Sequence, residues 1–249
     1  LPDLTVISPV FDGERLVAFV ASRGHHADVG GITPGSMPPH STTIEQEGLL
    51  LDNVPLVRQG ALQEASWRER LRTGAFPVRN PDQLLADLQA QVAANHLGAE
   101  RLRELVQAQG AESVLSAMAQ VQAHAAEAVR RAIDRLVDGE ARVLMDDGAE
   151  LVVAVRVDHA QRRALIDFSG TSPQQTSNLN APLAITKAVV LYVFRCLVQE
   201  PIPLNAGCFE PLDLRVPEGS LLHPLPPAAV VAGNVETSQA VANALFAAL

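Results

Sequence analysis

Hydrophobic and polar residues alternate in two short runs at the start of the chain. Residues 4–11 and 15–21 both have the pattern of a half-buried strand, and Asp12-Gly13 lies between them. An Asp-Gly pair between two such runs is a strong signal for a β-hairpin. Residues 44–57 have the pattern of loop and short strand. We therefore expect β-rich structure up to about residue 60.

From residue 63 to 138 the apolar residues recur every three or four positions, which predicts helices. Asn80 and Pro81 are suited to the N-cap and the first helical position, and Gly98 is predicted to end that helix. A second helix should reach Gly110, and a third should run over residues 112–137. We interpret the apolar stripe of the third helix as core or as a subunit contact.

Strand patterns return in three runs, at residues 142–145, 150–158 and 163–168. Their close spacing predicts an antiparallel meander. Asn180 is the expected N-cap of a helix that continues to about residue 198. Residues 228–232 are expected to form a short buried strand before the last helix.

The fold class predicted from these patterns is α+β. Antiparallel hairpins and a meander are combined with an inserted helical segment and strand-helix units at the end. We assign residues 1–249 to one intertwined unit with three segments: β-rich 1–60, helical 61–140 and mixed α/β 141–249.

Composition excludes several classes of protein. The net charge is −9 and no basic cluster stands out, which argues against nucleic-acid binding. No uninterrupted apolar run reaches the roughly 20 residues that span a bilayer. Lys187 is the only lysine and lies outside any G-x-x-x-x-G-K-[ST] motif, so this stretch of chain holds no phosphate loop. Two isolated cysteines, Cys196 and Cys208, fit a reducing cytoplasm.

The first candidate site follows the hairpin, where residues 22–39 read Ser-Arg-Gly-His-His-Ala-Asp-Val-Gly-Gly-Ile-Thr-Pro-Gly-Ser-Met-Pro-Pro. His25 and Asp28 are suited to share one divalent ion, and imidazole with carboxylate fits Zn, Mn or Fe. His26 is a candidate general base or a group that supports the ligands. Glu47 is a candidate catalytic carboxylate or an extra ligand. The alternative is a glycine-rich turn whose histidines are ordinary polar residues.

Two polar loops, residues 169–180 and 233–237, are the second and third candidate sites. Each leads into a predicted helix, and the N-terminus of a helix favours anions. A substrate carboxylate or phosphate could be held there, although ordinary turn and capping chemistry explains the same residues. The candidate substrate-binding residues are Ser169, Thr171, Asn178, Asn180, Asn234 and Thr237.

The 22–39 motif resembles the signature of the hydantoinase B / 5-oxoprolinase family. Other blocks agree with it in the same order along the chain. They are Leu-Pro-Asp-Leu-Thr-Val at 1–6, Asp-Phe-Ser-Gly-Thr-Ser-Pro-Gln-Gln at 167–175, Asn-Leu-Asn-Ala-Pro at 178–182, Pro-Leu-Asn-Ala-Gly-Cys at 203–208 and Gly-Asn-Val-Glu-Thr-Ser-Gln at 233–239.

The resemblance implies one subunit or half of an ATP-dependent amidohydrolase that opens cyclic amides such as 5-oxoproline, hydantoins or lactams. A hydantoinase A-like subunit or domain would bind ATP, in keeping with the missing phosphate loop. His25 and Asp28 match the metal-binding His-x-x-Asp of the family, and further ligands would lie in a motif upstream of Leu1. The chain is therefore expected to be a fragment of a longer subunit. Alternatives are a subunit of an ATP-dependent ketone carboxylase and a non-catalytic assembly subunit.

Overall fold

A computed structural model describes residues 2–249, which fall into two compact units, one ending at Ala117 and one running from Met118 to Leu249. Unit 1 contains β1 (Asp3–Asp12), β2 (Arg15–His25), α1 (Ile44–Glu47), β3 (Val57–Arg58), β4 (Ala61–Leu62), α2 (Glu64–Arg72), α3 (Pro81–Gln109) and the start of α4 (Ala111–Ile133). Unit 2 contains the rest of α4, β5 (Gly139–Leu144), β6 (Glu150–Asp158), β7 (Arg163–Asp167), α5 (Leu183–Leu197), η1 (Ala206–Phe209), β8 (Leu212–Arg215), η2 (Gly233–Thr237) and α6 (Ser238–Ala248). No helix within residues 2–249 is long and apolar enough to cross a membrane.

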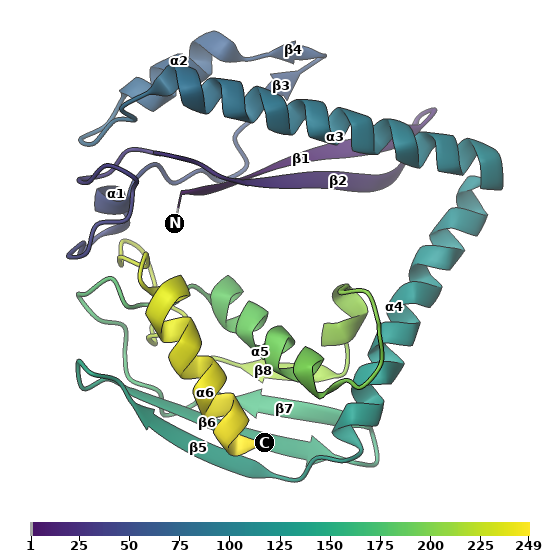
Figure 1. The fold of residues 1–249 in the computed structure, drawn as a ribbon, viewed down its shortest axis with the longest axis vertical. Helices are drawn as coiled ribbons and strands as arrows, with labels where there is room; N and C mark the ends of the chain where they lie inside the picture. The colour runs from purple at the N-terminus through teal and green to yellow at the C-terminus, as the bar shows by residue number, and fades with distance from the viewer. Residues whose placement is uncertain (1) are drawn as a thin grey trace. The chain divides into compact units, whose positions relative to one another are not determined.

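Unit 1 is built around the predicted hairpin, which is confirmed. β1 and β2 pair antiparallel, and Gly13 turns the chain with a φ of 59°. A two-stranded hairpin is barely stable by itself in water, and here α3 packs along one of its faces (Figure 1). The buried amide of Asn95 on α3 donates to the Val6 carbonyl oxygen at 2.9 Å, so the helix also binds the strands through polar contacts.

The prediction that Gly98 ends a helix is wrong. α3 continues through this position and ends only before Gly110, whose φ is 81°. Glycine in a helix interior costs about 1 kcal/mol relative to alanine. That cost is outweighed because the buried stripe of α3 continues beyond Gly98 at Ala99 and Val106.

Unit 2 consists of one four-stranded sheet with helices on one face (Figure 1). The strand order is β5-β6-β7-β8; the first three strands form the predicted antiparallel meander, and β8 joins β7 in parallel. Buried side chains of the sheet, such as Val153 and Ile166, share a core with Phe194 of α5 and Leu245 of α6. The α+β prediction is confirmed.

Four local predictions are wrong. Residues 44–47 form the short helix α1, and residues 228–232 form no strand. Helix α5 starts at Leu183 after Pro182, and no side chain caps it. The Asn180 side chain bonds instead to loop main chain, an interaction that spacing along the sequence does not reveal. α4 ends at Ile133, four residues before the predicted end.

Candidate functional site

His25 is the last residue of β2, and its ring is held by a carboxylate from β1. The hairpin register places His25 directly opposite Asp3. His25 Nδ1 lies 2.7 Å from Asp3 Oδ1, and Arg23 Nη2 lies 3.1 Å from Asp3 Oδ2. The Asp3 side chain is 19% exposed, whereas the His25 side chain is 64% exposed. One edge of the imidazole is therefore bonded, and the ring remains accessible to solvent.

The charge state of Asp3 decides the tautomer of His25. Partial burial by itself would raise the pKa of Asp3, but hydrogen bonds from His25 and Arg23 outweigh it, and the net pKa lies below its usual value. An ionised carboxylate only accepts hydrogen bonds. His25 therefore donates from Nδ1–H, and in the neutral ring Nε2 carries a lone pair. This is the arrangement of a general base or of a metal-binding imidazole.

Asp28 lies beyond the hairpin in the glycine-rich loop, where it is bound by Arg79. Arg79 Nη1 is 2.6 Å from Asp28 Oδ1, and the Arg79 main-chain N–H donates to Asp28 Oδ2 at 3.0 Å. The Gly30 N–H also donates to Oδ2, at 3.2 Å. A second Arg79 nitrogen, Nη2, donates to the Gly31 carbonyl oxygen at 2.7 Å. The Asp28 carboxylate thus fastens its loop to the start of α3.

Glycine is required where this loop meets α1. A Cβ on Gly31 would lie 2.7 Å from the Gln46 carbonyl oxygen, closer than real Cβ atoms approach. Gly31 also has a φ of 88°, which side-chain-bearing residues rarely adopt. Ser36 closes the loop from inside, because its buried hydroxyl accepts from Val29 N–H and donates to the Gly30 carbonyl oxygen. These contacts hold the main chain of the loop in place.

His26 points away from His25, into the layer between β2 and α3. It is only 4% exposed, and its Nε2 lies 3.2 Å from Gln91 Oε1. Gln91 in turn donates to the carbonyl oxygens of Leu4 and Ser22, both at 3.0 Å. His26 Nδ1 lies 3.6 Å from an Asp87 carboxylate oxygen. The geometry gives His26 a role in fastening the hairpin to α3, and its role as a general base stays a prediction.

Glu47, the last residue of α1, is buried and borders a cavity in unit 1. Its Oε1 accepts a hydrogen bond from Ser41 Oγ at 2.7 Å. The cavity measures about 870 Å³ and is lined by β1, by residues 47–57 and by one side of α3. Asp3 and Asp52 line the same cavity, so three carboxylates border it.

The described residues do not form a metal site by themselves. Within residues 2–249, no group of three or more His, Cys, Asp or Glu side chains is placed to hold one ion. A protein site for a divalent transition metal needs three or four ligands. Asp28, one of the two predicted ligands, is paired with Arg79. An ion at His25 would need donors from beyond these residues.

In unit 2 the structure brings the two predicted substrate loops together. A Cβ on Gly233 would lie 2.1 Å from the Asn180 carbonyl oxygen, so the two backbones touch. The Ala232 N–H donates to the Asn178 carbonyl oxygen at 3.0 Å. Residues 233–237 form one turn of π-helix, a feature frequently found at functional sites.

Three of the six predicted substrate-binding side chains form hydrogen bonds with main-chain groups in or beside these loops. Asn180 is fully buried; it donates to the carbonyl oxygens of residues 175, 177 and 229 and accepts from the Gln175 N–H. Thr171 bonds both main-chain groups of Val152, and Thr237 donates to the Leu179 carbonyl oxygen. Asn178 is buried, whereas Ser169 and Asn234 are exposed. None of these contacts tests substrate binding, which stays a prediction.

Sequence reasoning missed Arg79 and Gln91. Arg79 is 51 residues from its partner Asp28, and Gln91 is 65 residues from His26. Arg79 directly precedes the Asn80-Pro81 helix start, but that signal says nothing about what the guanidinium binds. Gln91 is a polar residue on the otherwise apolar side of α3. This irregularity is a signal that could have indicated a buried polar contact.

Comparison with known proteins identifies relatives along the whole chain. Residues 1–249 match the family described as hydantoinase B/oxoprolinase. The chain is 43% identical over 272 residues to 5-oxoprolinase 1 of Arabidopsis thaliana. The match covers 100% of this chain and 22% of that protein. It thus spans about a fifth of this curated relative.

Two solved structures share the fold. One is the ATP-dependent caprolactamase from Pseudomonas jessenii, with a TM-score of 0.84 at 24% identity, covering 99% of this chain and 44% of that one. The other is a nucleotide-free acetone carboxylase, with a TM-score of 0.78 at 18% identity, covering 94% of this chain and 33% of that one. At these identities the likeness concerns the fold alone.

Proposed function

Because the chain belongs to the hydantoinase B/oxoprolinase family, we propose that the complete protein is an ATP-dependent hydrolase that opens a cyclic amide. The substrate would be of the 5-oxoproline, hydantoin or lactam type. The proposal is supported by the match over the full length of the chain and by the name 5-oxoprolinase carried by the Arabidopsis relative. It applies to the whole protein, of which residues 1–249 would be one part.

The observation that carries the proposal is the His25–Asp3 pair. Opening a cyclic amide requires water to attack a carbonyl carbon and lose a proton. A histidine whose Nδ1 is bonded to a carboxylate at 2.7 Å, and whose side chain is largely exposed, is oriented to accept that proton. His25 would therefore handle the proton, with Asp3 as the residue that positions its ring. Glu47 borders the neighbouring cavity and would be a second carboxylate within the same unit.

ATP would be handled elsewhere. The sequence contains no phosphate loop, and we propose that a hydantoinase A-like subunit or domain binds ATP and activates the amide. The Ser169–Asn180 and Gly233–Thr237 loops of unit 2 remain candidates for contact with the substrate through their exposed members, Ser169 and Asn234. The cytoplasmic location inferred from the two isolated cysteines stays a prediction.

A divalent ion also stays a prediction. His25 and Asp28 would be its ligands, and such an ion would polarise a carbonyl when bound. Residues 2–249 do not complete such a site by themselves, so its further ligands would have to come from outside them.

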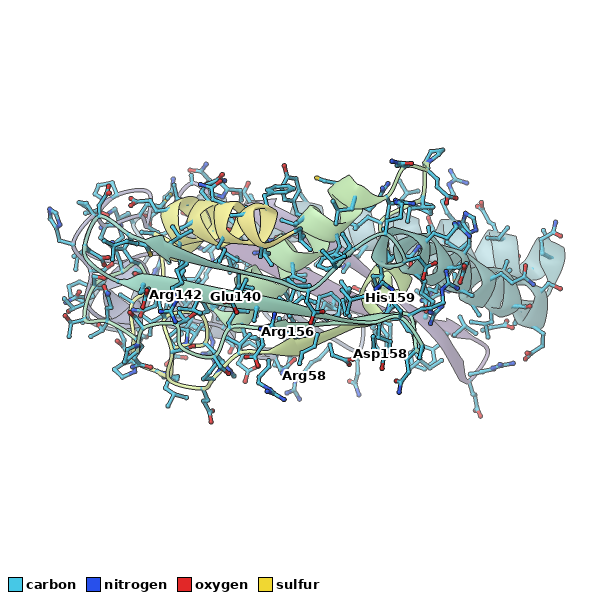
Figure 2. The ribbon with its side chains drawn as sticks, turned by 90° about the horizontal axis from the view of Figure 1, so that it is seen from below. Arg58, Glu140, Arg142, Arg156, Asp158 and His159 are labelled. Atoms are coloured by element: carbon cyan, nitrogen blue, oxygen red, sulfur yellow. The ribbon has the colours of Figure 1, made fainter. Side chains whose placement is uncertain are left out.

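The test is turnover by the complete protein with its ATP-binding partner, ATP and a panel of cyclic amides. His25→Ala should lower kcat at least about a hundredfold, the usual scale for a general base. His159→Ala is the matched control, because His159 is an exposed histidine in the turn after β6 (Figure 2), and it should keep full activity. Wild-type turnover in His25→Ala would overturn the assignment of His25.

The same assay separates the alternatives. Product formed from a small ketone, and only when bicarbonate is present, would support an ATP-dependent carboxylase in place of a hydrolase. Absence of ATP-dependent turnover with either class of substrate would favour a non-catalytic assembly subunit.

A further inference from the structure

The outer edge of β1 is open. The His26 N–H donates to the Pro2 carbonyl oxygen at 2.8 Å, which makes these two opposite residues a hydrogen-bonded pair. In an antiparallel ladder such pairs alternate with non-bonded ones, so the main-chain groups of Thr5 and Ile7 point away from β2. Within residues 2–249, β1 pairs with β2 only, and no hydrogen bond reaches the main-chain N–H or C=O of Thr5 or Ile7.

This open edge forms one wall of the 870 Å³ cavity. Every residue of the run 3–9 lines the cavity. Consecutive residues of a strand all line a cavity when the cavity borders the edge of the strand, because side chains on one face would alternate. Residues 48–57 form the facing wall, and α3 contributes Leu88, Val92 and Ala99 to the lining. The cavity is therefore a groove between the edge of β1 and residues 48–57, and α3 lines it with both apolar and polar side chains.

The chemistry of the groove suits an extended peptide. Unpaired N–H and C=O groups of an edge strand bind another strand by β-augmentation, while apolar pockets take its alternate side chains. Pro9, which has no N–H, also falls at an outward-pointing position, where proline is tolerated on an edge strand. The outer face of the hairpin exposes Ile7 by 62% and Phe19 by 63%, a further sign that more polypeptide covers this hairpin.

We propose that the groove beside β1 is filled by an extended strand from the remainder of the same subunit, which pairs with Thr5 and Ile7 and converts the hairpin into a three-stranded sheet. The relatives are long enough to supply this strand from outside the matched region. This chain covers 22% of the Arabidopsis relative and 44% of the caprolactamase chain that shares its fold. In proteins of this family, more than half of the polypeptide lies outside the matched region. The proposal rests on family membership and is independent of the proposed chemistry.

The first test is amide hydrogen exchange on the full-length subunit, resolved to single residues by mass spectrometry. Leu4 and Val6 are internal references, because their N–H groups point toward β2. With the strand in place, the amides of Thr5 and Ile7 exchange as slowly as these references, on the order of a hundredfold or more slower than an open amide. Exchange of Thr5 and Ile7 at the open rate would overturn the proposal.

The second test identifies the occupant. The full-length Ile7→Cys variant, in a Cys196→Ser background, is labelled with a benzophenone maleimide and irradiated. The expected product has the mass of one subunit and joins position 7 to a peptide from outside residues 1–249. A product joining two copies, or joining the subunit to the ATP-binding partner, would overturn the proposed source, as would failure to cross-link any peptide.

Leu144→Cys in the same background is the matched control. Leu144 is 73% exposed on β5, whose neighbouring outward side chains are paired with one another. This variant should yield no specific peptide adduct.

Discussion

The outward face of the β1–β2 hairpin and the outward face of the β5–β8 sheet carry different kinds of side chain. On the sheet, arginines and carboxylates pair across neighbouring strands, as Figure 2 illustrates for Glu140, Arg142 and Arg156. The four pairs are Arg142–Glu150, Arg156–Glu140, Arg163–Asp213 and Arg215–Asp167, all between 2.8 and 3.2 Å. On the hairpin, one end carries the His25–Asp3–Arg23 cluster, and the other exposes Ile7, Phe11 and Phe19.

The difference indicates which of the two faces is stable in water without a further partner. A face whose charges are mutually paired is stable in water without a partner, whereas a row of exposed large apolar side chains marks an interaction surface. The outward face of the sheet in unit 2 is therefore expected to be stable in water without a partner. The hairpin of unit 1 has an apolar face, an open edge and an accessible histidine, and we expect it to meet substrate and further polypeptide.

The largest expected effect concerns the apolar face of the hairpin. In the full-length protein, Phe19→Ser should lower the free energy of unfolding by about 3 kcal/mol, because a covered aromatic ring would be lost. Leu144→Ser on β5 is the control and should change stability by less than about 0.5 kcal/mol. Denaturant unfolding of both variants measures the difference. Equal, small effects would mean that the two faces are alike.

A smaller effect on stability is expected from the ion pairs. The Arg79–Asp28 pair, which holds a loop, should matter more than the exposed pairs on the face of the sheet. Arg79→Ala should cost about 2 kcal/mol, because it leaves the largely buried Asp28 carboxylate and the Gly31 carbonyl oxygen without their partner. Arg156→Ala should cost less than about 0.5 kcal/mol, since its partner Glu140 is 75% exposed. Chemical denaturation measures both, and a cost for Arg156→Ala as large as that for Arg79→Ala would contradict this distinction.

The smallest effect is a dependence on pH. The pKa of Asp3 is lowered in the folded protein, so its contribution to stability is present above its ordinary pKa and is lost as pH falls through the lowered value. Asp3→Asn should remove this contribution, less than about 1 kcal/mol given the exposure of its partners, and should flatten the stability curve below about pH 4.

Asp167→Asn is the counterpart in unit 2. Partial burial would raise the pKa of Asp167, but hydrogen bonds from Ser169 and the ion pair with Arg215 outweigh it and lower the pKa. Thermal unfolding between pH 2.5 and 6 compares the two variants with wild type. If the thermal stability of Asp3→Asn fell at low pH as steeply as that of wild type, His25 and Arg23 would not stabilise the ionised Asp3 carboxylate.

Elements with a strong local pattern were predictable. The Asp12-Gly13 hairpin, the start of α3 at Asn80-Pro81 and the meander of β5 to β7 all follow from periodicity and turn chemistry. The errors occurred where a local preference was overridden by packing. Gly98 favours the end of a helix, yet the buried stripe of α3 continues past it.

The candidate site was predictable only in part. The 22–39 motif located His25, and the hairpin register made its opposition to Asp3 derivable in principle. His26 and Asp28 were assigned to the same centre, but the fold turns one toward Gln91 and binds the other to Arg79. The direction of a side chain in a loop depends on neighbours that are distant in sequence, and no local pattern encodes them.

The sequence by itself determined the family, the order of the main elements and the stretch in which the candidate histidine His25 lies, because local sequence patterns carry each of them. The tertiary structure decided which polar groups are already bonded. Asp28 reaches Arg79 across 51 residues, His26 reaches Gln91 across 65, and Asn180 reaches Ala229 across 49. A buried polar group must find a partner wherever the fold supplies one, so only the fold separates these structural groups from His25, whose ring stays accessible to solvent.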